Sequence, residues 1–305
     1  MKPLLVVNPK AGGGRTGAII GDVRGAIERS KIGEVDVVQT TGRGSAIDLA
    51  EAGANGGREL VVAVGGDGTF SEVCNGVLRS KKPARVALIG QGTGGDFRKT
   101  LGIEHRLDRY IEAIASGKER SLDVGKARYR EDGRDHERYF VNILSAGMGG
   151  LVDEYVASGS RALGGTAAYF IASTKALLRV RPGNLKCTID GEVVRMRSYM
   201  IAICNGRYFG SGMHVAPMAL VDDGKLEVVS MDAPNKMAFA AFSRKIYDGS
   251  HLRSRDVRHF SCEKIEMDLE NEDARDTFRL DVDGEPLGGL PLAIEVIPRA
   301  IVLRG

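Results

Sequence analysis

The feature that most constrains this chain is an apolar run that breaks into glycines around one carboxylate. Val61 to Val64 are apolar without alternation, and Gly65-Gly66-Asp67-Gly68-Thr69 follows directly. Such a run is typical of a parallel strand covered on both faces, and glycines allow backbone angles that side chains forbid. Thr69 or Ser71 can cap a following helix, whose free N–H groups and positive dipole end attract anions. The stretch predicts a strand, a tight turn and a helix, with phosphate as the candidate ligand.

An ordinary glycine-rich connection is the alternative to a phosphate site, because short glycine motifs occur in many strand-to-helix turns. Asp67 favours a ligand. A carboxylate beside a bound phosphate is tolerated mainly when Mg²⁺ or a hydrogen-bond donor accompanies it. This stretch alone leaves both interpretations open.

Two further glycine turns follow strand-like runs. Leu4 to Val7 precedes the turn at 8–17, and Val86 to Ile89 precedes the turn at 90–97. The first of these turns lacks the GxxxxGK[ST] spacing of a P-loop, so it could also be a surface loop. With the pattern at 35–40, strand and helix alternate four times, which predicts a parallel sheet with helices on both faces. Because ligands gather at the carboxyl ends of such strands, the three turns should meet at one edge.

The sequence changes character near residue 123. Asp-Gly turns between short apolar segments, at 132–133, 190–191 and 283–284, replace the alternation and predict hairpins. We expect two domains: an α/β, Rossmann-like nucleotide domain with a parallel sheet at 1–122, and an antiparallel, mainly β sandwich at 123–305. The C-terminal strand of the second could pack back on the first.

Two helical patterns interrupt the second half, at 161–179 and 234–247. We expect their apolar stripes to pack in the core rather than insert into a membrane. In the first of these helices the expected core stripe comprises Leu163, Ala167, Phe170, Ile171, Leu177 and Leu178.

Composition limits the class of partner. The formal charge is +3, with 43 Lys and Arg against 40 Asp and Glu, which disfavours a nucleic-acid binder. Cations gather between residues 244 and 258, where either anionic lipid or solvent could face them. The four cysteines lack metal-ligand spacing and indicate reduced core residues. Without a signal peptide or an apolar stretch of roughly 20 residues, we expect a cytoplasmic protein, with peripheral membrane contact left open.

Taken in order, the motifs resemble the diacylglycerol kinase catalytic family, which includes bacterial lipid kinases and sphingosine kinases. The motifs are Asn8-Pro9, the GGDGT run from Gly65, the GTGGDF run from Gly92, Asn205-Gly206, Asp222-Asp223-Gly224-Lys225 and Asp283-Gly284-Glu285. The ordered set spans almost the whole chain and is more specific than GGDGT, which NAD kinases and phosphofructokinases share in related form. The resemblance implies an ATP-dependent kinase of a lipid alcohol, with diacylglycerol converted to phosphatidate.

The resemblance also implies roles for individual residues. Asp67 would face Mg²⁺ or a bound water, and Asp283 and Glu285 are candidate general bases, of which we favour Glu285. A structural Mg²⁺ would be held by Asp223 with carbonyls of Leu220 and Lys225. The nucleotide would lie against Asn8, Pro9, Lys10, Ala11, Gly12, Thr40, Gly65, Gly66, Asp67, Gly68, Thr69, Phe70, Ser71 and Thr93. The lipid would enter between residues 140–148 and 208–214.

Several alternatives stay open. Asp190-Gly191-Glu192 repeats the Asp283 tripeptide, and spacing cannot separate the two. Asp222-Asp223-Gly224 is also a common turn sequence. Gly95 stands where the family commonly has Asn, and Ser45 where it often has Asp. The acceptor could be a sphingosine-like or other lipid alcohol or a soluble molecule as in NAD kinases. The chain could also be a nucleotide-binding regulatory module, and it could form a homodimer.

Overall fold

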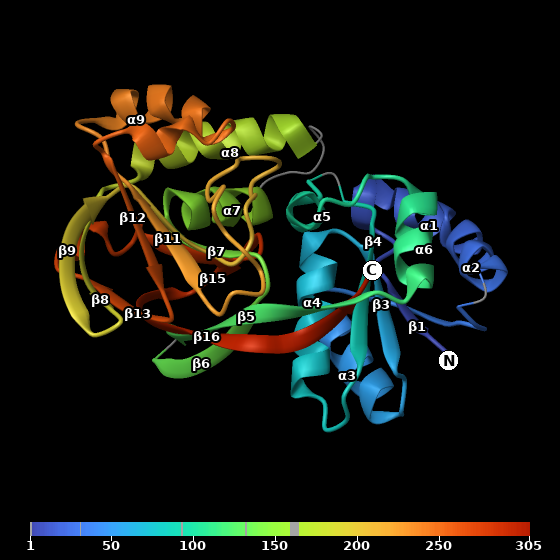
Figure 1. Ribbon diagram of the computed structural model, residues 1–305. Coiled ribbons are helices and arrows are strands. Elements are labelled where there is room, and N and C mark those ends of the chain that lie inside the picture. The colour runs from blue at the N-terminus through green and yellow to red at the C-terminus, as the bar shows by residue number, and fades with distance from the viewer. Residues whose placement is uncertain (1, 31, 93, 132, 159–164) are drawn as a thin grey trace. The chain divides into compact units, whose positions relative to one another are not determined.

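The computed structural model describes residues 2–30, 32–92, 94–131, 133–158 and 165–305 (Figure 1). Internal contacts divide the chain into two compact units. The first comprises Met1–Val124, Gly210–Gly212 and Pro298–Gly305, and the second comprises Gly125–Phe209 and Met213–Ile297. Two long strands, β5 and β16, each contribute residues to both units. No helix in the described part of the chain is both long enough and apolar enough to cross a membrane.

The first unit is built on a parallel sheet in the order β2-β1-β3-β4. At the β4 edge, Leu303 of β16 pairs in parallel with Val86. Every residue of β1 and β3 is buried, as expected for strands covered on both faces. The four strands are β1 Leu4–Val7, β2 Asp36–Gln39, β3 Leu60–Gly65 and β4 Arg85–Gly90.

Helices cover both faces of this sheet. On one face, Ile27 of α2 and Ile111 of α6 join a core with Leu5. On the other face, Leu4 lies against Gly53 of α3, and α4 packs on α3 and β3. The helices are α1 Arg15–Ala18, α2 Ile20–Arg29, α3 Ser45–Asn55, α4 Asp67–Arg79, α5 Asp96–Leu101 and α6 Leu107–Ser116, with the 3₁₀ turn η1 at Ala11–Gly14. The predicted α/β fold of the N-terminal half is confirmed.

Two antiparallel sheets form the second unit. One contains β16-β13-β8-β9, with the β5–β6 hairpin attached to β16. Its strands are β5 Glu119–Glu131, β6 Arg134–Phe140, β8 Gly183–Ile189, β9 Glu192–Ser198, β13 Lys264–Leu269 and β16 Gly289–Arg304. The other has the order β12-β11-β10-β7-β14-β15. Its strands are β7 Ile143–Gly147, β10 Met200–Cys204, β11 Leu226–Met231, β12 Val257–Cys262, β14 Arg279–Val282 and β15 Glu285–Leu287.

The core of this unit lies between the two sheets. Leu144 and Ile203 of one sheet pack in a single buried cluster with Ile265 and Leu292 of the other. The predicted β-sandwich is therefore confirmed.

Helices cover the outer face of the β7-containing sheet. They are α7 Met148–Ser158, α8 Gly165–Arg179 and α9 Lys236–Ser243, and the 3₁₀ turns η3 Arg244–Ile246, η4 Ser250–Arg253 and η5 Glu272–Ala274 lie elsewhere in this unit. Ala172 and Ala176 of α8 and Phe239 of α9 pack against strand residues such as Met231. Helix α7 has no counterpart in the sequence-based prediction.

The predicted core stripe of α8 is wrong at two positions. Ile171 and Leu178 are 41% and 71% exposed. Ala172, Ala176 and Val180 occupy the face toward the sheet at i, i+4 and i+8, so residues 171 and 178 point away from it. Leu163 and the side chains of Ala167 and Phe170 lie outside the described residues.

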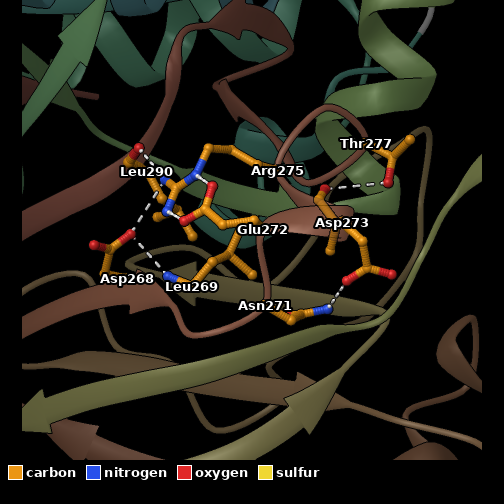
Figure 2. A network of polar contacts seen from close by, with 9 residues as sticks. Asp268, Leu269, Asn271, Glu272, Asp273, Arg275, Thr277 and Leu290 are labelled. Carbon is orange, nitrogen blue, oxygen red and sulfur yellow. Dashed lines mark hydrogen bonds and ion pairs between the residues drawn. The ribbon is translucent and has the colours of Figure 1, made fainter.

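A polar network fixes the loop that leads into β14 (Figure 2). The Arg275 guanidinium donates two hydrogen bonds to Glu272, at 2.7 and 2.8 Å, and one to the Leu290 carbonyl at 3.1 Å. It also approaches Asp268 at 3.4 Å, and Asp268 accepts the Leu269 N–H. The hydrogen bonds to Glu272 raise the pKa of Arg275. The network joins the loop to the end of β13 and the start of β16.

Candidate active site

The predicted phosphate turn is the N-terminus of α4. Strand β3 ends at Gly65, and the first helical hydrogen bond of α4 runs from the Phe70 N–H to the Gly66 carbonyl at 3.1 Å. The three preceding N–H groups therefore lie outside the helical ladder, where an anion can accept from them. A Cβ atom on Gly65 would lie 2.5 Å from Thr69 Oγ1, so the turn has no room for a side chain there. The side chains of Phe70 and Ser71 are buried in the interior.

The three glycine turns of the first unit meet, as the sequence predicts. Asn8 Nδ2 donates to Thr69 Oγ1 at 3.2 Å, which joins the first turn to the second. A Cβ atom on Gly92 would lie 2.7 Å from the Gly66 Cα, which shows direct backbone contact between the second turn and the third. Backbone groups from three strand ends are therefore available to one ligand.

The first turn is held by local hydrogen bonds and carries an exposed cation. Asn8 Oδ1 accepts the Lys10 N–H at 3.1 Å, and the Lys10 side chain is exposed beside it. Pro9 and Ala11 flank this cation, and Gly12 has a left-handed φ of 60°. Thr40 at the end of β2 donates its N–H to the Val7 carbonyl at 2.8 Å and so lies at the same sheet edge. Thr93 lies outside the described residues.

Asp67 joins the second turn to the third. Its carboxylate accepts the Asp96 N–H at 3.0 Å and the Phe97 N–H at 3.1 Å, so it caps α5. Burial raises the pKa of Asp67, the two N–H groups act against that shift, and the Asp96 carboxylate adds to it. Both oxygens of Asp67 already accept backbone N–H groups. Contact between Asp67 and Mg²⁺ stays a prediction.

Arg98 is a candidate site residue that the sequence analysis missed. It lines a small pocket with residues of the second and third glycine turns and their neighbours, namely Gly65, Gly66, Asp67, Leu88, Gly90, Gly92, Gly95 and His105. A Cβ atom on Gly95 would come within 3.1 Å of Arg98 Nε, and Arg98 Nη1 donates to the Ile103 carbonyl at 2.6 Å. Gly95 has a left-handed φ of 57°, which Asn also tolerates better than most residues. With Gly95 in place of the family's Asn, the backbone can keep the same left-handed conformation. The Arg98 guanidinium lies near the position where the Asn side-chain amide would be.

In the second unit, Asp283 and Glu285 flank the tight turn between β14 and β15. The Asp283 carboxylate accepts N–H groups from Val141, Asn142 and Ile143 at 3.2, 3.1 and 3.0 Å. Glu285 Oε2 accepts from Arg138 Nη2 at 2.9 Å, and the two side chains are only 19% and 13% exposed. Asp283 thus holds the hairpin to the start of β7, while Glu285 is oriented by one cation.

Further polar groups lie around this hairpin. Asn142 Nδ2 donates to the Tyr208 carbonyl at 2.9 Å, and the Tyr208 ring stacks on His214 with centroids 4.2 Å apart. Asn142 Oδ1 and His214 Nε2 are buried without a hydrogen-bond partner in the part of the chain that the structure describes. Because an unpaired buried polar atom destabilises the fold, both atoms are candidate contacts for a polar ligand.

The predicted lipid entry between residues 140–148 and 208–214 stays a prediction, and three glycines in and beside the first segment are closely packed. Gly147, Gly149 and Gly150 are filled positions: a Cβ on Gly147 would lie 2.5 Å from the Tyr199 carbonyl, and the other two meet Ser145 and Arg279. These glycines allow α7 to pack closely on β7 and β14.

The predicted structural metal site is an exposed turn before β11. Asp223 Oδ1 accepts the Lys225 N–H at 3.0 Å, and Leu220, Asp223 and Lys225 are exposed. No cluster of three or more His, Cys, Asp or Glu side chains that could hold a metal occurs among the described residues. One carboxylate with two carbonyls would not form such a cluster, so this Mg²⁺ site stays a prediction.

An acidic pair beside the hairpin, with Asp281 buried and Asp153 half-buried, also escaped the sequence analysis. Asp281 is 3% exposed and hydrogen-bonded to Ser145. Burial raises the pKa of Asp281, and the carboxyl of Asp153 on α7 raises it further; burial likewise raises the pKa of Asp153 to about 6. The two groups titrate as a pair. Nothing local in the sequence connects residues 153 and 281.

Comparison with known proteins agrees with this arrangement. The family model "Diacylglycerol kinase catalytic domain" matches residues 2–127. The model "YegS C-terminal NAD kinase beta sandwich-like domain" matches residues 142–304.

Similar proteins cover nearly the whole chain. A Yersinia enterocolitica protein named "Probable lipid kinase YegS-like" is 26% identical over 99% of this chain and 96% of its own length. The "Diacylglycerol kinase" of Bacillus subtilis is 24% identical over 85% of this chain and 81% of its own. The solved structure of a Bacillus anthracis protein, proposed to be a diacylglycerol kinase, has a TM-score of 0.79 at 25% identity and covers 99% of this chain and 96% of that one.

Proposed function

This chain belongs to the diacylglycerol kinase family of ATP-dependent lipid kinases, and we propose that its reaction is transfer of the γ-phosphoryl group of ATP to the hydroxyl of diacylglycerol. The observation that carries the proposal is the meeting of three glycine turns at the N-terminus of α4. Relatives named diacylglycerol kinase support the choice of acceptor.

The first unit would bind the triphosphate. The N–H groups of residues 67–69 and the Asn8 turn offer donors, while Lys10 and Arg98 supply positive charge. Mg²⁺ bound with ATP would neutralise charge on the phosphates during transfer. Burial raises the pKa of Asp67. A cation bound nearby would therefore stabilise the ionised form of this carboxyl.

The second unit would supply the base. Glu285 accepts the hydroxyl proton while the lipid oxygen bonds to the γ-phosphorus and the bond from that phosphorus to the bridging oxygen breaks, releasing ADP. Arg138 orients Glu285, and Asp283 positions the hairpin through its three backbone hydrogen bonds. This division of roles supports Glu285 rather than Asp283 as the base.

A parallel acceptor assay tests the proposal. Purified protein receives labelled ATP and Mg²⁺ with dispersed dioctanoylglycerol, sphingosine or NAD in separate reactions. We expect labelled phosphatidate as the main product, and far less of it with Glu285→Gln. If only sphingosine or only NAD were labelled, that molecule would be the acceptor instead of diacylglycerol. ATP binding without any labelled product would favour a regulatory module.

A further inference from the structure

The carboxyl of Asp281 lies in the interior behind the hairpin that carries the proposed base. It belongs to β14, the first strand of that hairpin, and its neighbours on the two flanking strands are Ser145 of β7 and a proline of β15. Neither neighbour carries a charge. Two further carboxyls act on it, those of Asp153 on α7 and of Asp283. An ionised carboxylate is costly in such surroundings, because burial removes it from water and like charges repel it.

Asp281 joins three parts of the second unit through hydrogen bonds. Ser145 Oγ on β7 donates to Asp281 Oδ2, and the Gly284 N–H in the hairpin turn donates to the same carboxyl. The carboxyls of Asp281 and Asp153 are also hydrogen-bonded to each other, which adds a link to α7. The turn that precedes Glu285 is therefore tied to a neighbouring strand and to a helix through one side chain.

Two glycines allow α7 to lie directly against this group. A Cβ atom on Gly149 would lie 2.2 Å from Ser145 Oγ and 3.4 Å from Asp281 Oδ2, and one on Gly150 would lie 2.3 Å from the Arg279 carbonyl. The helix packs on β7, β14 and β15 (Figure 1), and Asp281 is only 3% exposed. A side chain at either glycine would push the helix away, so this close packing fixes which polar groups face Asp281.

One proton satisfies the groups of this cluster. Burial raises the pKa of Asp281, the carboxyls of Asp153 and Asp283 add to that shift, and the two hydrogen bonds that Asp281 accepts act against it. When Asp281 is protonated, its O–H can donate to the Asp153 carboxylate while its carbonyl oxygen accepts from Ser145 and Gly284. When Asp281 and Asp153 are both ionised, neither can donate, and two adjacent negative charges repel each other where α7 meets β14.

We propose that Asp281 is a positioning residue for the kinase reaction: as a neutral acid held between Asp153 and the Gly284 turn, it fixes the hairpin that presents Glu285. The inference rests on the proposed role of Glu285 as the base and adds a residue that acts through it. Asp283 holds the same turn through three backbone N–H groups. The turn is thus anchored by two side chains rather than one.

The pH profile of turnover tests the inference. Initial rates with dispersed dioctanoylglycerol give kcat for each protein between about pH 6 and about pH 10. We expect the wild-type kcat to fall at alkaline pH as Asp281 loses its proton. Asp281→Asn should keep turnover and lose that fall, because the amide makes the same contacts without a titrating proton. Asp281→Ala should lower kcat about 10²-fold at neutral pH without changing ATP affinity, since a base misplaced by about 1 Å reacts far more slowly.

Two more variants serve as matched tests. Asp153→Asn should also remove the alkaline fall, because the introduced amide donates to an ionised Asp281 instead of repelling it. Glu154→Gln removes the same charge from the next residue of α7, which pairs with Arg279 at 3.5 Å in a half-exposed ion pair, and should keep the wild-type profile. An alkaline fall that persists in both Asn variants, or full turnover of Asp281→Ala, would overturn the inference.

Hydrogen exchange of the Gly284 amide separates this inference from the proposed reaction. At one fixed pH, we expect slow exchange in wild type and in Asp281→Asn, and roughly tenfold faster exchange in Asp281→Ala. Exchange in the Ala variant as slow as in wild type would refute the anchoring role, whatever the turnover. The expected exchange pattern together with undiminished turnover of Glu285→Gln would instead refute the proposed base and keep Asp281 as an anchor of the hairpin.

Discussion

The hairpins at residues 190–192 and 283–285 carry the same tripeptide, Asp-Gly-Glu, within the same unit. Both turns have left-handed residues, with φ of 46° and 90° in the first and 49° and 82° in the second. Asp190 accepts the N–H groups of Glu263 and Lys264 at the surface. Asp283 instead accepts three consecutive N–H groups in partly buried surroundings.

The two glutamates differ more than the two turns. Glu192 is exposed, whereas Glu285 is mostly buried against Arg138. The strand before each turn differs too, with Thr188 in one and buried Asp281 in the other. The same tripeptide therefore has different contacts in the two hairpins, because the residues around it differ. The following substitutions test that difference.

The largest expected effect is on turnover. Glu285→Gln should lower kcat by about 10² to 10⁴, because the amide cannot accept the hydroxyl proton, while Glu192→Gln should stay within about twofold of wild type. Initial rates with dioctanoylglycerol measure both, and retained ATP binding shows that the fold is intact. Equal losses in the two variants would remove the distinction between the hairpins.

A smaller effect is expected on stability. Asp283→Asn should lower the free energy of unfolding by about 2 kcal/mol, since a neutral amide replaces a partly buried carboxylate that binds three N–H groups. Asp190→Asn should cost about 0.5 kcal/mol, because its bonds are exposed to water. Asn keeps the left-handed conformation in both. Urea unfolding monitored by circular dichroism measures the difference, and similar losses would contradict it.

The next effect is a pH dependence. Burial raises the pKa of Asp281 and of Asp153, the latter from 3.8 to about 6, so the folded state binds more protons than the unfolded chain in that range. The free energy of unfolding should therefore fall as pH rises from about 4 to 6, by at most about 1.4 kcal/mol per pH unit for one proton.

Two substitutions test which residue causes the change of the unfolding free energy with pH. Asp281→Asn should flatten this pH dependence, because the buried carboxyl at position 281 is replaced by an amide that does not titrate, whereas Thr188→Val at the matching position should leave it unchanged. Urea unfolding at about pH 4 and about pH 6 gives the comparison. A slope that persists in Asp281→Asn would assign it to other groups.

The smallest difference concerns the turn glycines. A Cβ atom on Gly191 or Gly284 would meet nothing within 4 Å, so Ala at either position pays only for the left-handed backbone, about 1 to 2 kcal/mol. We expect Gly191→Ala and Gly284→Ala to lower the midpoint of urea unfolding equally. A markedly greater loss at Gly284 would show that the two turns are not equivalent.

Several features were predictable because they are local. The apolar run at 61–64 and the glycines after it predict a strand end and a helix start within one short stretch, and the fold has both. The hairpin at Asp283 follows from its own Asp-Gly pair. Helix α7 was missed since its glycines at 149 and 150 suggest a loop, whereas they permit its close packing on β7 and β14.

By itself, the sequence determined the order of strands, turns and helices in the first unit, and the family motifs. Only the tertiary structure decided which Asp-Gly-Glu hairpin has a glutamate paired with an arginine, that Arg98 shares a pocket with two of the glycine turns, and that Leu178 faces water. The physical reason is separation along the chain. Arg138 and Glu285 are 147 residues apart, and no periodicity or turn preference records which distant side chain will lie beside a carboxylate.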